Sequence, residues 1–368
     1  MDTRLRLRGY DEFTGLAKVL ATLGGALAAE LALFDRQRTL LGLEYSNEFL
    51  DSESSSTTSF PALNQTVRLD EARIQTVSGF AQHEAALTET LKGFVGARVY
   101  AVEAELEKSN NAVPNSNDDV RALGSLGLVY VPSDAWSLRA NLSQGYTYPT
   151  LAQLFLSTTA GGQLTVGNPD LDPETSVTFE IGGRYGANGV VLDAAIFYSR
   201  AKDFIDRQQT STSPAPTGSY FNLDRATTYG FELFANTQIG KTGWSPYLSA
   251  SVLRREFDYG NGTTTFDSGT PLLSGRAGVR YDWLWGDAAF GHVDVFVRGQ
   301  TGARERSRTG ALAEGDGFAT LNLHAHATIQ DNLRIGVAFN NLLDQGYEPL
   351  DETLAAGRNV ELFATINF

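Results

Sequence analysis

Cysteine is absent from the 368-residue sequence, which excludes thiol catalysis, disulfide scaffolds and thiolate metal sites. Long apolar runs are absent too, since no segment offers the roughly 18 uninterrupted apolar residues that a membrane helix needs. The nearest candidate, residues 16–34, contains Lys18, Gly24, Gly25 and Glu30. A helix there would place two charges in lipid and two helix-weakening glycines in mid-span. We therefore expect a β-hairpin with Gly24-Gly25 in its turn.

Basic residues are scarce relative to acidic ones: 29 Lys and Arg stand against 43 Asp and Glu, a net charge of −14. Such a chain is a poor candidate for nucleic-acid binding, which draws much of its affinity from phosphate neutralisation. The first residues also lack the apolar core of a signal peptide. If the chain is exported, we expect its precursor to begin further upstream.

What the sequence does contain is a repeated alternation of apolar and polar residues. In the last segment, one predicted face carries Val360, Leu362, Ala364, Ile366 and Phe368, and the other carries Asn359, Glu361, Thr365 and Asn367, with Phe363 the one exception. The same period of two recurs in residues 333–340, 321–330, 292–298, 176–184 and 136–143. One such segment fits any half-buried sheet, but many in succession favour a barrel wall with lipid outside and water inside.

Counting these segments predicts about sixteen strands, uncertain by two, at about 9–11 residues per crossing. Short connections are expected at residues 132–134, 186–189 and 330–332. Long polar ones are expected at residues 51–70, 109–119, 157–174, 208–219, 259–270 and 304–315. Short and long connections alternate in the second half of the chain. This alternation is expected of a barrel whose one end carries tight periplasmic turns and whose other end carries extended extracellular loops. The predicted fold is an all-β transmembrane antiparallel β-barrel over residues 1–368.

Two boxes in the middle of the chain resemble a known family. They are Tyr146-Thr147-Tyr148-Pro149-Thr150-Leu151 and Gly167-Asn168-Pro169-Asp170-Leu171-Asp172-Pro173-Glu174. They resemble the FRAP and NPNL boxes of haem and haemoglobin receptors, a branch of the TonB-dependent outer-membrane receptors. Residues 197–205, 221–232, 340–349 and 357–368 are similar to later motifs of that family. The resemblance is continuous from about Trp136 to terminal Phe368 and looser before it.

The resemblance implies a receptor in the bacterial outer membrane that binds an iron chelate, such as haem or a siderophore, and imports it when TonB pulls on a plug domain. Receptor barrels of this kind have about 22 strands, so a chain without a plug would be the C-terminal part of one, with residues 3–9 left from a further strand. The implied partners are outer-membrane lipid, the TonB complex through the missing plug, and the ligand. No cofactor is expected beyond a transported haem or ferric chelate. A plugless passive pore or structural remnant is the alternative function.

The candidate ligand-binding residues come from the two boxes: Tyr146, Tyr148, Pro149, Asn168, Pro169, Asp170 and Leu171. Each proline lacks a ladder donor, so shaping the loop end is the simpler role for the second box. A tyrosine can ligate haem iron, but tyrosines at a strand end more often belong to the interfacial girdle. The loop between the boxes contains no histidine, whereas the resemblance implies a haem-ligating histidine there.

Three histidines share the polar register that would face the barrel lumen: His292, His324 and His326. His324 and His326 lie two apart and so point to the same side of one strand. Polar lining of a wet interior is the simpler interpretation, and no metal site is predicted, because the further ligands cannot be located. The sequence has neither a nucleophile elbow nor a phosphate-binding glycine loop, so we expect no enzyme activity.

Overall fold

The computed structural model describes residues 14–31, 36–56, 65–110, 112–160, 163–211, 217–286, 289–306, 312–330, 332–348 and 354–366. Within these ranges the only helix is α1 (Leu151–Leu154), and every other element is a β-strand. No described helix is long and apolar enough to cross a bilayer.

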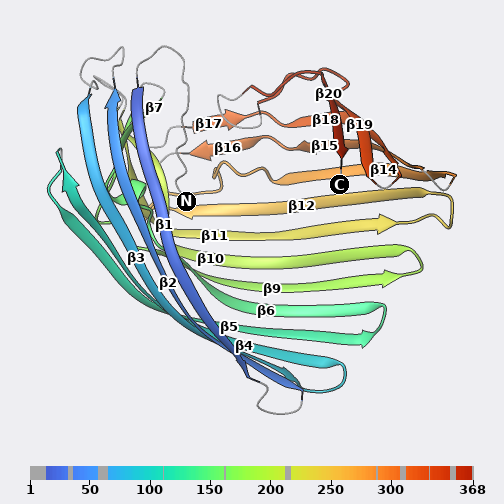
Figure 1. The fold of residues 1–368 in the computed structure, drawn as a ribbon, viewed down its shortest axis with the longest axis horizontal. Coiled ribbons are helices and arrows are strands. Elements are labelled where there is room, and N and C mark those ends of the chain that lie inside the picture. Colours follow the sequence, from blue (N-terminus) through green and yellow to red (C-terminus); the bar gives the residue numbers. More distant parts are fainter. Residues whose placement is uncertain are drawn as a thin grey trace.

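All the described strands except β16 and β17 form one strongly curved 18-stranded sheet (Figure 1). Fifteen of them make an antiparallel meander in which each strand pairs with the next. They are β1 (Thr14–Leu31), β2 (Gln37–Ser56), β3 (Gln65–Ala86), β4 (Leu91–Ser109), β5 (Asn115–Ser133), β6 (Trp136–Thr147), β9 (Glu174–Ala187), β10 (Val190–Ser211), β11 (Thr217–Thr237), β12 (Trp244–Asp258), β14 (Leu273–Trp285), β15 (Ala289–Gln300), β18 (Phe318–Ile329), β19 (Leu333–Asn340) and β20 (Asn359–Ile366). In the part of the chain that is described, no pairing joins β1 to β20.

The remaining strands are short and belong to the long connections. β7 (Ser157–Ala160), β8 (Gln163–Val166) and β13 (Thr264–Thr265) extend the main sheet, and β16 (Ala303–Arg306) pairs with β17 (Leu312–Gly315) in a separate hairpin. The fifteen meander strands agree with the prediction of about sixteen strands, uncertain by two. From β12 to β20 long and short connections alternate, at residues 259–272, 286–288, 301–317, 330–332 and 341–358, and the sequence did not indicate the last of the long ones. The expected remnant strand at residues 3–9 lies outside the described residues.

The predicted hairpin turn at Gly24-Gly25 is wrong, because β1 runs through both glycines. Gly24 pairs with Ser46 and Gly25 with Tyr45 in an unbroken register. The apolar alternation also continues across the pair, since Leu23 and Leu27 lie on the same face and are 67% and 78% exposed. Without a polar neighbour to favour a turn, the two glycines are simply strand residues. β2 follows after Arg36, whose φ of 64° lies in the left-handed region.

The predicted loop at residues 51–70 is also too long. Residues 51–56 belong to β2 and residues 65–70 to β3, and the two strands are paired there. Their polar and charged residues predict a loop only where a strand needs one apolar face. Charged residues are compatible with a strand wherever both faces are in water.

Alternate residues divide the sheet into an apolar outward face and a polar inward face. On β15, Val295 and Val297 are 40% and 45% exposed, whereas Asp294 and Phe296 on the other face are buried. The polar face is concave, because side chains from strands far apart in the sheet meet across it. The apolar face is therefore the outer wall, as the period-two pattern predicted.

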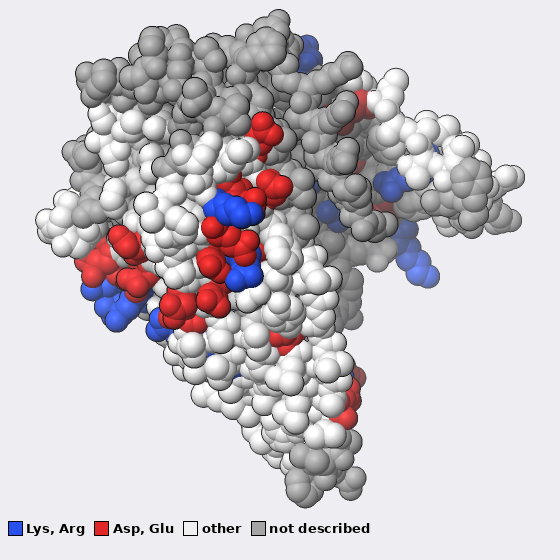
Figure 2. Space-filling view, turned by 60° about the vertical axis from the view of Figure 1, so that its left-hand side comes forward, with Lys and Arg blue, Asp and Glu red and all other residues white. Residues whose placement is uncertain are grey.

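On β4 the outward face changes from apolar to charged within two residues. Val99 and Ala101 are followed on that face by Glu103, Glu105 and Glu107. Two of these acids pair with one basic residue of β3, at Arg73–Glu105 (2.7 Å) and Arg73–Glu107 (3.1 Å). Figure 2 shows acidic and basic side chains gathered on one part of the surface, next to a wall without charge.

This change places the hydrocarbon boundary on β4 between Ala101 and Glu103, because charges are costly in lipid. The ten steps from Leu91 to Ala101 span roughly 33 Å along the strand. At a tilt of about 45° that length covers roughly 24 Å of depth, close to the apolar band of outer-membrane barrels. The long connections lie beyond the charged end, and the short turns lie at the opposite end.

Candidate functional site

The connection between β6 and β9, residues 148–173, contains the second tyrosine of the first box and most of the second box, and it folds onto the sheet. It begins with α1, whose cap Thr150 accepts the Gln153 N–H (3.3 Å) and donates its own N–H to the Gln153 side chain (2.8 Å). This reciprocal pattern is a capping box, which starts the helical turn. Hairpin β7–β8 follows, and β8 pairs in parallel with the first residues of β11.

Apolar side chains fix this connection to the concave face. Its buried residues are Leu151, Leu154, Phe155, Leu156 and Leu171, and their partners on the wall are Leu50, Ala72, Ile74, Val102, Ala104, Leu106 and Ile205. These partners belong to β2, β3, β4 and β10, with β5, β6 and β9 lying between in the sheet. One segment can contact both groups only from the concave side. The connection therefore covers part of the inner wall at the charged end.

The two tyrosines of the first box point into this cluster and not toward lipid. The Tyr146 ring stacks on Tyr100 of β4 with centroids 5.3 Å apart, and its hydroxyl is buried, with no hydrogen-bond partner of good geometry among the described residues. The Tyr148 hydroxyl donates toward the carbonyl oxygens of Asn117, at 2.7 Å for the backbone and 2.6 Å for the side chain. Burial raises the pKa of Tyr148. Both rings thus serve as packing groups of the connection, and Pro149 between them is fully buried.

Asn117 links the two boxes, although no sequence motif distinguishes it. Its side-chain N–H groups donate to the carbonyl oxygens of Pro169 (2.9 Å) and Leu171 (3.1 Å). It lies on β5, in a region predicted as a polar loop, and only the fold brings it to Tyr148. A single asparagine residue thereby satisfies one hydroxyl and two backbone carbonyls.

The polar atoms of the second box are bonded to the neighbouring strands. Asn168 donates to the Tyr220 carbonyl (3.0 Å) and accepts the Asp170 N–H (3.0 Å). Glu174 accepts the Ile205 N–H at 2.8 Å, and burial raises the pKa of its carboxyl group. Among the predicted residues of this box, Asp170 alone is exposed, while Asn168 and Pro169 are half-buried and Leu171 is buried. The boxes therefore meet as one packed unit.

Nearer the middle of the sheet, the concave wall carries ion pairs that form a polar surface. Arg139 of β6 pairs with Glu180 (3.1 Å) and Asp193 (3.0 Å). Arg276 of β14 pairs with buried Asp294 at 2.7 Å. The Tyr247 hydroxyl donates to the same carboxylate at 2.9 Å, and Arg276 donates to that hydroxyl at 2.8 Å.

A cavity of about 570 Å³ lies on this wall between the two arginine clusters. Its charged lining comes from Arg139, Arg184, Asp193, Glu232 and Arg276, and serines of β12 and β14 complete it. In the described part of the chain, Arg184 and Glu232 form no ion pair, so their charges are available to a ligand. The sequence indicated a polar lumen but not which charges would meet.

The three predicted histidines lie on the inward face of neighbouring strands. His292 of β15 pairs directly with His326 of β18, and their rings stack at 4.7 Å. The His292 Nδ1 atom lies 2.6 Å from Asp282, and Arg334 donates to the His326 Nδ1 atom at 3.2 Å. His324 lies 3.1 Å from the Asn340 side chain. Among the described residues, no group of three or more His, Asp or Glu is arranged to hold a metal ion.

Residues 3–342 match the family model described as TonB dependent receptor-like, beta-barrel. The vitamin B12 transporter BtuB of Vibrio vulnificus is 28% identical over 68% of this chain and 39% of its own length. The pesticin receptor of Yersinia pestis is 31% identical over 39% of this chain and 19% of its own length.

Two solved structures show the same fold. The copper transporter OprC superposes with a TM-score of 0.81 at 16% identity, over 96% of this chain and 59% of that chain. The ferric yersiniabactin uptake receptor FyuA from Yersinia pestis superposes with a TM-score of 0.69 at 19% identity, over 96% of this chain and 55% of that chain. This chain thus spans less than two thirds of the length of each of these relatives.

Proposed function

Because the chain belongs to the family of TonB-dependent receptor β-barrels of the bacterial outer membrane, we propose that it forms the wall of an importer for anionic ferric chelates of the siderophore class, energised by the TonB complex. The family consists of receptors, so the chain is not an enzyme. The prediction that residues 1–368 form a barrel domain alone, with the plug and the TonB-contacting segment encoded elsewhere, stays a prediction. An in-frame plug in the upstream DNA would test it.

The observation that carries this proposal is the arginine-lined cavity on the concave wall. Guanidinium groups donate several hydrogen bonds in a fixed plane, which suits the carboxylate and phenolate oxygens around chelated iron. Arg184 has no ion pair among the described residues, and the Asp294 carboxylate that pairs with Arg276 also accepts a hydrogen bond from Tyr247. A cavity of about 570 Å³ is within the size range of small-molecule sites.

The names of the relatives favour the same ligand class over its alternatives. Among them are a ferric yersiniabactin receptor and the siderophore receptor PiuA of Acinetobacter baumannii. Others are described as transporters of vitamin B12 or copper. Vitamin B12 carries little net charge to engage the arginines, and copper would need a cluster of ligating side chains, which the described residues lack.

The geometry of the two boxes supports haem less well than the arginine-lined cavity supports a ferric siderophore. The Tyr148 hydroxyl is used by Asn117, and the Tyr146 hydroxyl is buried in the wall. Neither is placed to ligate iron in the lumen. In our proposal Tyr146, Tyr148, Pro149, Asn168, Pro169 and Leu171 hold the connection in place at the outer mouth, and exposed Asp170 borders it. His292, His324 and His326 contribute polar lining.

A ligand panel tests the proposal. The chain, refolded in detergent, would be titrated with ferric tris-catecholate, haemin, cyanocobalamin and cupric ion, and binding followed by tryptophan fluorescence. We expect saturable binding of the ferric chelate, weakened about tenfold by Arg184→Ala, because a charge-assisted hydrogen bond contributes about 1.5–3 kcal/mol. Arg73→Ala on the outer surface is the matched control and should change nothing. A Soret shift with haemin and no binding of the ferric chelate would overturn the assignment.

A further inference from the structure

His83 is an exception on the outward face. On β1 to β6 and on β9, between the charged boundary and the short turns, every other described outward position holds an apolar, small, aromatic or uncharged polar residue. His83 is thus the one Asp, Glu, Lys, Arg or His side chain on the described lipid-facing wall of these seven strands. It lies three residues before the end of β3 at Ala86, roughly 10 Å along the strand from the turn. That depth is near the membrane interface, where a polar side chain costs little.

The imidazole is held in one orientation by the neighbouring strand. Thr39 of β2 pairs with His83 in register, and its hydroxyl lies 2.9 Å from the His83 Nδ1 atom. Among the described residues, Nε2 has no hydrogen-bond partner. When the threonine hydroxyl donates to Nδ1, the neutral ring carries its proton on Nε2. A donor then points outward beside lipid.

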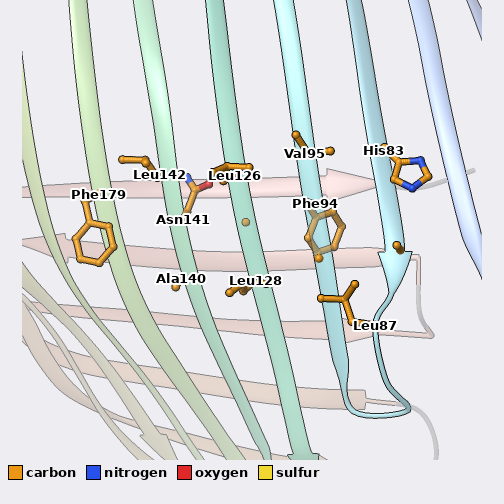
Figure 3. A pocket seen from close by; sticks show the side chains of 13 residues that line it. His83, Leu87, Phe94, Val95, Leu126, Leu128, Ala140, Asn141, Leu142 and Phe179 are labelled. Atoms are coloured by element: carbon orange, nitrogen blue, oxygen red, sulfur yellow. The ribbon is translucent and has the colours of Figure 1, made fainter.

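A groove begins at this histidine and crosses the outer wall (Figure 3). Its volume is about 440 Å³, and nearly all of its lining is apolar. One edge follows a single row of directly paired residues from His83 through Val95, Leu126 and Leu142 to Phe179. Small residues of the adjacent row, Ala85, Gly93 and Ala140, leave the depression beside that edge.

The direction of the groove matches a lipid chain that enters the bilayer from the short-turn side. His83 is three residues from the short-turn end of its strand, whereas Phe179 is eight residues from the corresponding end of β9 at Ala187. The groove therefore runs from the interface toward the middle of the membrane. Crossing four strand intervals covers roughly 19 Å, or roughly 13 Å of depth at a tilt of about 45°. That depth is close to one leaflet of a hydrocarbon core about 30 Å thick.

We propose that this groove is a binding site for one phospholipid of the periplasmic leaflet. One acyl chain lies in the groove, and the His83 Nε2–H group donates to the phosphate of the headgroup. The short-turn end is the periplasmic end of this family's barrels, which selects a glycerophospholipid of that leaflet. The site is independent of the cavity on the inner wall and of the imported ligand.

Native mass spectrometry of the folded chain with dipalmitoyl phosphatidylglycerol tests the site. We expect one retained lipid, with an affinity about tenfold lower in His83→Phe, because the donor to a charged acceptor is lost while the bulk remains. Gly93→Leu, which fills the floor of the groove, should reduce retention similarly. His83→Gln keeps an N–H donor and should bind within about threefold of the wild type. His326→Phe on the inner wall is the matched control and should retain the lipid.

Heat-modifiable gel mobility would report whether each variant is folded. If His83→Phe fails to fold, the other two variants test the site: reduced lipid retention in Gly93→Leu together with near wild-type retention in His83→Gln would support it. Equal retention by all folded variants would overturn the proposal. So would dipalmitoyl glycerol binding as tightly as the phospholipid, since the headgroup contact would then have no role. Preference for lipopolysaccharide over phosphatidylglycerol would place the occupant in the other leaflet and also refute the assignment.

Discussion

Replacing Leu154 by alanine should release the connection between β6 and β9 from the concave wall. Leu154 is completely buried, at 0% exposure, among side chains of the connection and of the neighbouring strands. A leucine-to-alanine change at such a site costs about 2–5 kcal/mol, because the cavity cannot fully collapse against a rigid sheet. Taking about 3 kcal/mol, the population of the released connection should rise roughly 100-fold.

Hydrogen exchange read by mass spectrometry measures this population. The informative amides are those of β8, whose parallel pairing with β11 depends on the docked connection. We expect them to exchange roughly 100-fold faster in Leu154→Ala, while amides of β9 and β10 stay protected. Leu343→Ala, at a leucine that is 71% exposed in another long connection, is the control and should leave the rates unchanged. If β8 exchanges within twofold of the wild-type rate in Leu154→Ala, the apolar anchoring described above is refuted.

Further predictions concern the polar contacts of the same region and of the inner wall. Asn117→Ala should raise β8 exchange by roughly tenfold or more, since two hydrogen bonds to the second box and one to Tyr148 are lost, and unchanged rates would argue against the link. Burial raises the pKa of Glu174 above its ordinary 4.5, so docking should strengthen as the pH falls from neutrality toward that value. Exchange measured at pH 5 and pH 7.5 checks this, and Glu174→Gln should abolish the difference. Arg139→Ala should lower the heat-modification midpoint only modestly, by the equivalent of about 1 kcal/mol, because its two ion pairs are partly exposed.

The sequence predicted the wall well because one physical rule governs it. Lipid on one side and water on the other impose a period of two. The alternation therefore predicts both the strands themselves and the side that each residue faces, inward for His292 and outward for Val293. Gly24-Gly25 misled because glycine permits a turn without requiring one. Residues 51–56 do not alternate and so predict a loop, whereas a strand beyond the lipid can be polar on both faces.

The docked connection could not be predicted for a different reason. Leu151, Leu154 and Phe155 show no strand period and read as an irregular loop. Their partners on β2, β3, β4 and β10 lie up to about a hundred residues away, so only the curvature of the sheet brings them together. Asn117 carries no local pattern at all, and its importance follows from the carbonyl groups that the fold places around it.

The abrupt change from Ala101 to Glu103 also fixes how high the molecule stands in the bilayer. Sinking by two residues along the strands would lower the wall by roughly 5 Å and carry the carboxylate of Glu103, the one nearest the boundary, into hydrocarbon. Rising by the same amount would expose a ring of apolar side chains to water. Both displacements raise the free energy, so the protein can move little along the membrane normal. The height of its outer mouth above the lipid surface is therefore set by the sequence of the wall, whatever ligand or partner approaches from outside.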